Sequence, residues 1–169
     1  MSFISYNDVQ TSLIGTSFLD GLAVGQTHVR GTGPYTIYRS ALFFDTSVLP
    51  DGATITSAVL SLYYFFDGFM PDRDFNVVVV DGAAVDDTVS LEDYGDLGAS
   101  MVNGRSLDTF DLSTISKRVY IPLEAAGIGW IDTSGVTKLG LRSSYDIAGT
   151  PPDEGQVNTV LFWGAGFGP

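Results

Sequence analysis

The 169-residue sequence has no cysteine and a single histidine, His28. Without cysteine the chain has neither a disulfide framework nor a thiolate metal site, so its stability must come from packing. One histidine is too few for a histidine-based zinc site, because tetrahedral sites draw most of their ligands from His and Cys. Catalysis of the Ser-His-Asp kind needs a base, and the chain contains no Gly-x-Ser-x-Gly segment. We therefore interpret His28 as a surface or strand-end histidine and predict that the protein is not an enzyme.

Positive charge is also scarce. Lys and Arg number eight against 20 Asp and Glu, so the formal net charge is -12. Such a chain repels an extended phosphate backbone and an anionic membrane surface. We therefore predict that nucleic acid is not a partner.

Long apolar runs are missing as well. No window reaches the roughly 18 apolar residues that a spanning helix needs. The first residues, "MSFISYNDVQTSLIGTS", lack the basic and apolar regions of a signal peptide. We predict no membrane insertion and no secretion signal in the chain as given. Two interpretations stay open: a segment of a longer secreted protein, or a complete protein released without a signal peptide, such as a virion component. Both predict a location outside the cell or on a virion surface.

The sequence is rich in glycine, aspartate and short strand-like segments. Its 44% apolar content is enough for one core, so we predict a single domain over residues 1–169. Strand signals separated by Gly, Pro, Asp and Asn predict an all-β fold, a jelly-roll-like β-sandwich of two antiparallel sheets with at most one or two short helical turns. The predicted strands are Thr11–Gly15, Gly21–Val29, Thr36–Asp45, Thr54–Phe66, Phe75–Asp81, Lys117–Leu123, Thr137–Ser144 and Asn158–Trp163.

The fourth predicted strand shows the clearest alternation. Successive side chains of a strand point to opposite faces, so its residues fall into two sets. One set is Ala58, Leu60, Leu62, Tyr64 and Phe66; the other is Val59, Ser61, Tyr63 and Phe65. We expect the first set to face the core. Ile55 is out of phase with it, which predicts a bulge or bend before Ala58.

Two segments lack the sequence pattern of a β-strand. Residues Gly82 to Ser116 are too many for a plain connection, so we expect a short helix or irregular strands packed across one end of the sandwich. "PLEAAGIGW", Pro122 to Trp130, is suited to one helical turn, because Pro can begin a helix and Gly127 or Gly129 can end it.

Acidic clusters are the first candidates for a site. Calcium takes six to eight oxygen ligands, and two loops offer carboxylates. The candidate ligands are Asp67, Asp72 and Asp74 in the first loop and Asp86 and Asp87 in the second. Neither loop fits an EF-hand, because the sixth position from Asp72 is Val77 instead of glycine. We favour solvated acidic loops and keep a calcium site as the alternative; no cofactor is predicted with certainty.

Exposed aromatic side chains are the second candidates. Carbohydrate-binding proteins place aromatic rings against the apolar faces of sugar rings. Four aromatic residues near strand ends or in loops are candidate ligand contacts: Trp130, Tyr145, Trp163 and Tyr94. We favour core or rim packing for each, and interpret the aromatic residues within strands as core by default.

The segment "YRSALFFDTSVLPDGATITSAVLSLYYF", Tyr38 to Phe65, resembles the hallmark of the DNRLRE-type β-sandwich modules. A second segment, "IPLEAAGIGWIDTSGVTKLGLRSSYDIAGTPP", Ile121 to Pro152, is similar to the closing part of that family. The resemblance implies a jelly-roll-like, non-catalytic module akin to carbohydrate-binding modules. The arginine and asparagine letters that name the family are not found near the N-terminus, so nothing assigned to them is carried over.

The residues of the hallmark also have a structural interpretation. Leu42 and Phe44 share a face, and Asp45 is suited to end the strand and accept hydrogen bonds from the following turn. Arg39 and Arg142 are rare cations on strands, and we expect them to form ion pairs with carboxylates of the sandwich.

Two functions are predicted with equal weight. The first is a non-catalytic recognition module that binds a polysaccharide. The second is a self-assembling structural protein of a virion or surface filament, whose partners are other copies or neighbouring structural proteins, with a homo-oligomer as one form. A glycosidase that uses paired carboxylates is a minor third hypothesis.

Overall fold

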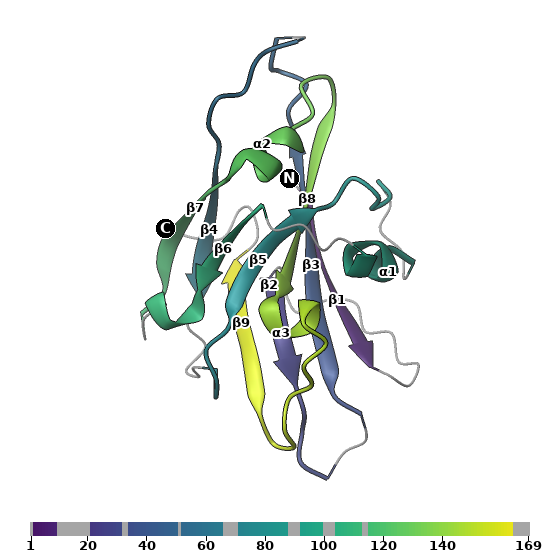
Figure 1. The fold of residues 1–169 in the computed structure, drawn as a ribbon, viewed down its shortest axis with the longest axis vertical. Helices are drawn as coiled ribbons and strands as arrows, with labels where there is room; N and C mark the ends of the chain where they lie inside the picture. Colours follow the sequence, from purple (N-terminus) through teal and green to yellow (C-terminus); the bar gives the residue numbers. More distant parts are fainter. Residues whose placement is uncertain are drawn as a thin grey trace.

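The computed structural model in Figure 1 describes residues 2–9, 21–31, 34–50, 52–65, 71–87, 92–99, 104–112 and 115–163. This part of the chain is all-β with a few short helices. The strands are β1 (Ser2–Val9), β2 (Gly21–Thr27), β3 (Thr36–Asp45), β4 (Val59–Phe65), β5 (Asn76–Asp81), β6 (Arg105–Asp108), β7 (Lys117–Pro122), β8 (Val136–Ser143) and β9 (Val157–Trp163). The helices are α1 (Glu92–Ala99), η1 (Thr109–Asp111), α2 (Ala125–Gly129) and α3 (Ser144–Ile147).

All strand pairs in the structure are antiparallel, and the strands form one sheet. Eight of them follow the order β6-β5-β8-β3-β2-β9-β4-β7, and β1 adds to β3. The two ends of this path approach each other, because the Glu124 amide donates to the Gly104 carbonyl at 2.8 Å and Arg105 pairs with Glu124. The sheet is therefore nearly closed into a barrel. The predicted division into two separate sheets is wrong, because β3 is hydrogen-bonded both to β8 and to β2. It therefore joins the strands β6-β5-β8 to the strands β2-β9-β4-β7, and we call these two groups the two halves of the sheet.

Strand β3 is the branch point of the sheet. It pairs with β1 over Thr36–Phe43, with β2 over 36–38 and with β8 over Ser40–Asp45. A strand has only two edges, and β1 takes one of them, so β2 and β8 share the other and diverge from it. At the divergence the Ser40 hydroxyl donates to the Ala23 carbonyl at 2.9 Å, which links the two halves. Gly25, just beyond, has a φ of 139°, and a Cβ there would lie 2.0 Å from the Asn158 carbonyl oxygen, so only glycine fits.

The inner core lies between the two halves. Along the strands whose side chains the structure describes, alternate residues point inward, as the alternation predicts. Leu60, Leu62 and Tyr64 of β4 are buried there, together with Leu42 of β3 and the Phe44 ring that packs against the core. The other buried apolar residues of this cluster are Leu22, Val24, Phe75, Val77, Val79, Leu112, Val119, Ile121, Leu139, Leu141, Val160 and Phe162.

A second, smaller core lies on the outer face of β3 and β5. It contains Ala41 and Phe43 of β3 and Val78 and Val80 of β5, covered by Leu97 of α1. Val85 of the segment after β5 also belongs to it. Strand β5 therefore buries apolar side chains on both faces, which explains its four consecutive valines. Helix α1 covers this outer face, instead of crossing one end of the sandwich as predicted.

Seven of the eight predicted strands are found, and all but one of these have only small shifts at their ends. Thr36–Asp45 is reproduced as predicted, whereas the segment Thr54–Phe66 becomes strand only from Val59. The predicted strand Thr11–Gly15 lies outside the described residues. Strands β1 and β6 were not predicted. The number of helices was underestimated, because the Asp- and Gly-rich segment that forms α1 has little apolar periodicity.

Candidate functional site

The outer face of β9, β4 and β7 carries outward-pointing aromatic side chains. Because Leu60, Leu62 and Tyr64 point into the inner core, the alternate residues of β4, Tyr63 and Phe65 among them, point outward. The same alternation places Trp163 on the outer face of β9 and Tyr120 on that of β7. The three strands lie side by side in Figure 1 and are hydrogen-bonded in that order.

Strand register brings these rings together. Tyr63 lies directly opposite Trp163 on one side and Arg118 on the other. Phe65 lies opposite Leu161, and its ring meets the Trp163 ring edge-on with 4.8 Å between centroids. Residues directly opposite each other on one face of a sheet have Cβ atoms about 5 Å apart. We call this surface, formed by Tyr63, Phe65, Tyr120, Leu161, Trp163, Ser61 and Arg118, the aromatic face.

The aromatic face combines accessible rings with hydrogen-bonding groups. Tyr120 is 62% exposed, while the rings of Tyr63, Phe65 and Trp163 are half-buried. Arg118 is exposed, and its Nη1 donates to the Ser61 hydroxyl at 3.4 Å. None of the ion pairs among the described residues includes Arg118. The face can therefore offer ring surfaces, hydroxyl groups and a guanidinium fork to a ligand.

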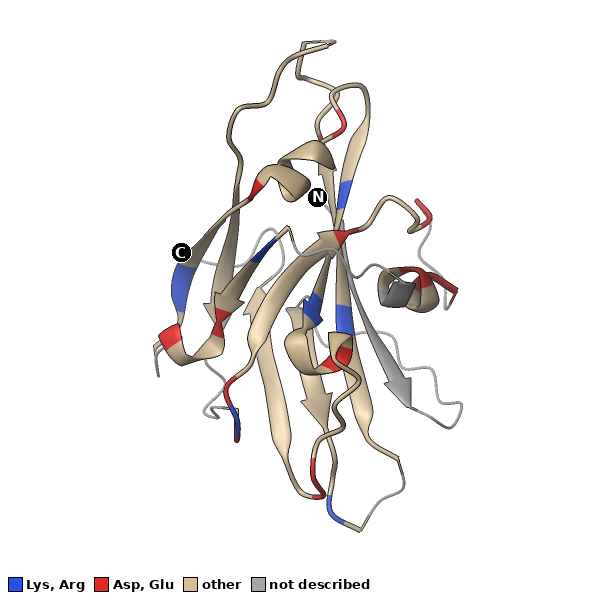
Figure 2. Ribbon diagram, viewed as in Figure 1, with Lys and Arg blue, Asp and Glu red and all other residues tan. Residues whose placement is uncertain are grey.

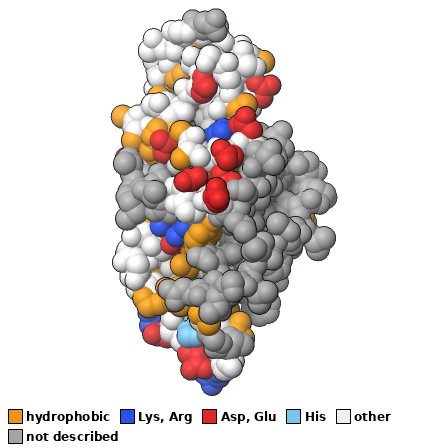
Figure 3. Space-filling model, turned by 90° about the vertical axis from the view of Figure 1, so that its right-hand side faces the viewer, with side chains coloured by type: hydrophobic (Ala, Val, Ile, Leu, Met, Phe, Trp, Pro, Cys, Tyr) orange, Lys and Arg blue, Asp and Glu red, His pale blue; other side chains and the backbone are white. Residues whose placement is uncertain are grey.

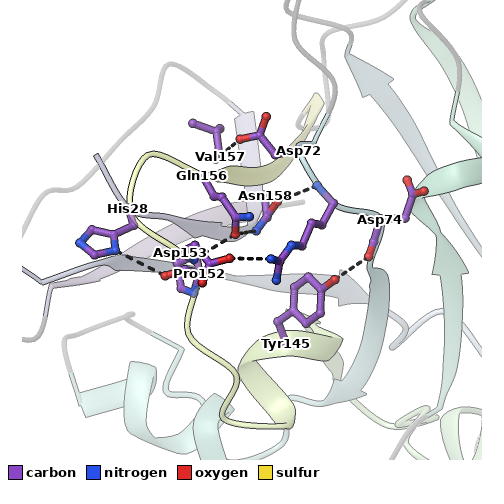
Figure 4. Close-up of polar contacts among 10 residues, drawn as sticks. His28, Asp72, Asp74, Tyr145, Pro152, Asp153, Gln156, Val157 and Asn158 are labelled. Atoms are coloured by element: carbon purple, nitrogen blue, oxygen red, sulfur yellow. Dashed lines mark hydrogen bonds and ion pairs between the residues drawn. The ribbon is translucent and has the colours of Figure 1, made fainter. Parts of the chain in front are cut away.

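Of the four predicted aromatic ligand contacts, only Trp163 lies on the aromatic face. Trp130 is half-buried at the end of α2 and packs so closely on Gly104 that a Cβ there would lie 2.3 Å from its ring. The Tyr145 hydroxyl donates to the Asp74 carbonyl at 2.9 Å (Figure 4). The Tyr94 ring lies under the Arg39 guanidinium, 3.8 Å from Cζ to the ring centroid. These three rings hold parts of the fold together, at places far apart in the chain.

The predicted calcium ligands lie in loops where several of them already have protein partners. The Asp72 carboxylate accepts a hydrogen bond from the Val157 amide at 2.6 Å (Figure 4), and Asp87 pairs with Lys138 at 2.7 Å. The Asp86 amide donates to the Asp93 carboxylate. Among the residues that the structure describes, no three His, Cys, Asp or Glu side chains lie close enough to hold a metal ion. Asp67 lies outside the described residues, and the calcium site stays a prediction.

Acidic side chains gather on the side of the molecule where α1 lies, as Figure 3 shows. The exposed acids of this region are Asp86, Asp87, Glu92 and Asp96. Lys138, which pairs with Asp87, also donates to the Val85 carbonyl at 2.6 Å. These acidic side chains form an exposed acidic surface beside α1.

Buried charges hold the helices against the covered outer face. Asp146 of α3 accepts two hydrogen bonds from Arg39 at 2.7 and 2.8 Å and one from Arg142 at 2.7 Å. Arg39 also donates to the Tyr94 carbonyl in α1 at 2.7 Å. Figure 2 shows the basic segments of β3 and β8 beside the acidic segment of α3. The predicted pairing of Arg39 and Arg142 with a carboxylate is confirmed, and both arginines take part in internal contacts.

The environment of Asp146 changes its acidity. Burial alone would raise the pKa of the Asp146 carboxyl. The hydrogen bonds and positive charges of Arg39 and Arg142 outweigh burial, so this pKa lies below the ordinary value for aspartate. Asp146 is therefore held as a carboxylate, the form that the two guanidinium groups require.

His28 lies just after the end of β2, as expected for a strand-end histidine. It is half-buried, its Nδ1 is 3.4 Å from the Pro152 carbonyl oxygen (Figure 4), and its own carbonyl accepts from the Gly155 amide. These contacts join the segment after β2 to the segment before β9. They give His28 a structural place at this end of the molecule.

Comparison with models of known protein families and with curated proteins found no match. The resemblance to the DNRLRE-type modules therefore stays a prediction from the sequence. Among the described helices, none has the length and apolar character needed to cross a bilayer.

The sequence analysis does not single out Tyr63, Phe65 and Tyr120 as candidate site residues. The alternation in β4 already separated Tyr63 and Phe65 from the core-facing set. Treating every aromatic residue in a strand as core removed that information. The feature that indicates a candidate site is that the outward-facing residues of β4, and not only its core-facing residues, include aromatic side chains.

Proposed function

We propose that this chain is a non-catalytic recognition domain that binds carbohydrate through the aromatic face, outside the cell or on a virion surface. The observation that carries the proposal is the outward position of Trp163, Tyr63 and Tyr120 on three neighbouring strands. The sequence resemblance to the DNRLRE-type modules points in the same direction.

The chemistry of the aromatic face suits a sugar ligand. A pyranose ring has apolar C–H faces that pack on aromatic rings, and polar edges that need hydrogen-bonding partners. On this face the tyrosine hydroxyls, Ser61 and Arg118 stand beside the rings. The Arg118 fork can donate two parallel hydrogen bonds to neighbouring ligand oxygens.

The test is a glycan array followed by affinity electrophoresis with wild-type protein and three variants. We expect Trp163→Ala and Tyr120→Ala to lose binding, because each removes a ring from the aromatic face. Phe110→Ala is the matched control, since Phe110 is an exposed aromatic residue outside this face. Thermal unfolding shows whether each variant is folded. A blank array with folded wild-type protein, or equal loss in Phe110→Ala, would contradict the proposal.

A second candidate function is self-assembly as a structural protein. Phe110 follows β6 and Ile115 precedes β7, so both lie next to the strands that end the sheet path. They are 74% and 70% exposed, and exposed apolar residues beside the end strands of a sheet favour association with another copy. Sedimentation velocity of the wild type and a Phe110→Ser/Ile115→Ser variant tests this function. A wild type that stays monomeric at high concentration would count against it.

A further inference from the structure

Helix α1 covers the second core, but its own sequence gives it little stability. It spans the eight residues Glu92–Ala99, and two of them, Gly95 and Gly98, are glycines. Isolated helices shorter than about 12 residues are marginal in water, and glycine is among the poorest helix formers. The helix lies beside β3 (Figure 1). Its helical form therefore depends on contacts with the strands that it covers.

Two kinds of contact attach α1 to the sheet. The first is apolar: Leu97 is fully buried, and a Cβ added at Gly140 of β8 would lie 2.5 Å from its Cδ2. The second is polar: the Arg39 guanidinium of β3 lies over the Tyr94 ring, and its Nη1 donates to the Tyr94 carbonyl at 2.7 Å. The polar contact requires that the guanidinium group keep one orientation.

Asp146 of α3 sets the orientation of Arg39. The Nε and Nη2 atoms of Arg39 donate to the two carboxylate oxygens of Asp146 at 2.8 and 2.7 Å. Such a bidentate pair fixes the plane of the guanidinium group, because the fork of donors is rigid. With Nε and Nη2 held in this way, Nη1 is directed at the Tyr94 carbonyl. One planar group therefore links α3 to α1.

Asp146 is itself held firmly enough to act as an anchor. Its carboxylate also accepts a hydrogen bond from Nε of Arg142 in β8 at 2.7 Å. Its amide donates to the Ser143 hydroxyl, which caps α3, at 3.1 Å. Helix α3 packs against β2, β5 and β8. The anchor is therefore part of the sheet, whereas α1 is joined to it through Arg39.

We propose that α1 is a displaceable cover and that Asp146 holds it closed through Arg39. When the Arg39–Asp146 pair is broken, α1 leaves the sheet as a unit while the barrel stays folded. Such an opening is sub-global, and it needs less free energy than unfolding of the whole domain. It uncovers the apolar side chains of the second core, which are Ala41, Phe43, Val78 and Val80. The proposal is independent of carbohydrate binding.

Native-state hydrogen exchange, followed for individual amides by NMR, tests this coupling. In Asp146→Asn the protection factors of the α1 amides fall roughly tenfold to hundredfold, as expected when hydrogen bonds to charged groups are lost. Val119→Ala is the control, because it truncates a residue of the inner core on β7. It lowers the protection of the strand amides and leaves that of α1 unchanged, since α1 opens without unfolding of the barrel.

Two results would overturn the proposal. If Val119→Ala lowers the protection of α1 and of the strands alike, α1 opens only with the whole domain. If α1 in Asp146→Asn keeps its wild-type protection, Asp146 does not hold the cover. Should Asp146→Asn fail to fold, Arg39→Lys provides the same test, because lysine keeps the charge but lacks the fork that joins Asp146 to Tyr94. Unchanged protection of α1 in that variant would also overturn the proposal.

Discussion

Two regions of the outer face of the sheet have the same alternating sequence pattern but different environments: the region of β3 and β5, and the region of β9, β4 and β7. On one, Ala41 and Phe43 alternate with core residues of β3 and are covered by Leu97 of α1. On the other, Tyr63 and Phe65 alternate with core residues of β4, and their neighbour Tyr120 is 62% exposed. An alternating strand therefore does not show which of its apolar faces is covered. The helix that covers one of them, α1, comes from a segment distant in sequence.

The difference extends to charge. The covered face has a buried carboxylate, Asp146, between two arginines, whereas Arg118 on the aromatic face is exposed. Breaking a buried pair leaves an uncompensated charge, which costs far more than loss of an exposed one. Substitutions on the covered face should therefore act mainly on stability, and those on the aromatic face mainly on binding.

The largest expected effect comes from Asp146→Asn. Two buried guanidinium groups lose their carboxylate, so the free energy of unfolding falls by about 3–5 kcal/mol. Asp153→Asn is the control, because Asp153 pairs with Arg73 at the surface and its loss costs under about 1 kcal/mol. Urea unfolding measures both variants. Equal effects would mean that the triad of Arg39, Asp146 and Arg142 does not secure the covered face.

A second comparison sets Leu97→Ala against Tyr120→Ala. Leu97 is fully buried against Gly140 and Val80, so truncation leaves a cavity and costs about 3 kcal/mol. The exposed Tyr120 should change stability by about 0.5 kcal/mol or less. Chemical denaturation measures both values. A similar loss of stability in the two variants would show that side chains of the aromatic face are packed as tightly as those of the covered face.

A smaller effect is expected at the point where the halves diverge. Ser40→Ala removes the buried hydrogen bond from the Ser40 hydroxyl to the Ala23 carbonyl, which should cost about 1 kcal/mol. Ser61→Ala, an exposed serine on β4, serves as the control and should be nearly neutral. Thermal unfolding monitored by circular dichroism compares the two. If Ser40→Ala leaves the thermal stability unchanged, this hydrogen bond does not contribute to joining the two halves of the sheet.

The most gradual effect is a change in acid sensitivity. Because the folded-state pKa of Asp146 is depressed, its stabilising contribution is present above the unfolded pKa of about 3.9 and is lost as pH falls through the folded pKa. The wild type should therefore approach the Asp146→Asn variant in stability below pH of about 4, by at most about 1.4 kcal/mol per pH unit.

This acid effect is measured by repeating urea unfolding of both proteins at several pH values. Hydrogen bonds from Ser47 and Ser134 also lower the pKa values of Asp45 and Asp132. Both groups are present in wild type and variant, so their contributions cancel in the difference. A difference in stability that stays constant down to low pH would show that Asp146 does not titrate in this range.

Most of the strands could be predicted because alternation and turn residues are local signals. Thr36–Asp45 is found at its predicted limits, and the Ser47 amide donates to Asp45 at 3.1 Å, as expected for a residue that ends a strand. The single continuous sheet could not be predicted, because it depends on how β2 and β8 share an edge of β3. That contact is set by packing between distant segments.

The aromatic face could be predicted only in part. Trp163 was named, and Tyr63 and Phe65 were assigned to the second face of their strand, but nothing local shows that α1 covers β3 and β5 instead of β4. The segment that forms α1 is dominated by Asp and Gly, and its core contact comes from one buried leucine, Leu97. The sequence therefore does not show which strands α1 packs against.

The separation of inward and outward residues along β4 and β9 has a consequence for variation. Because the inward set alone packs the core, the outward set can change its chemistry while the scaffold is retained. Related chains under selection for different targets would diverge at alternate positions of these two strands. A library that randomises only those positions would sample new specificities on an unchanged framework.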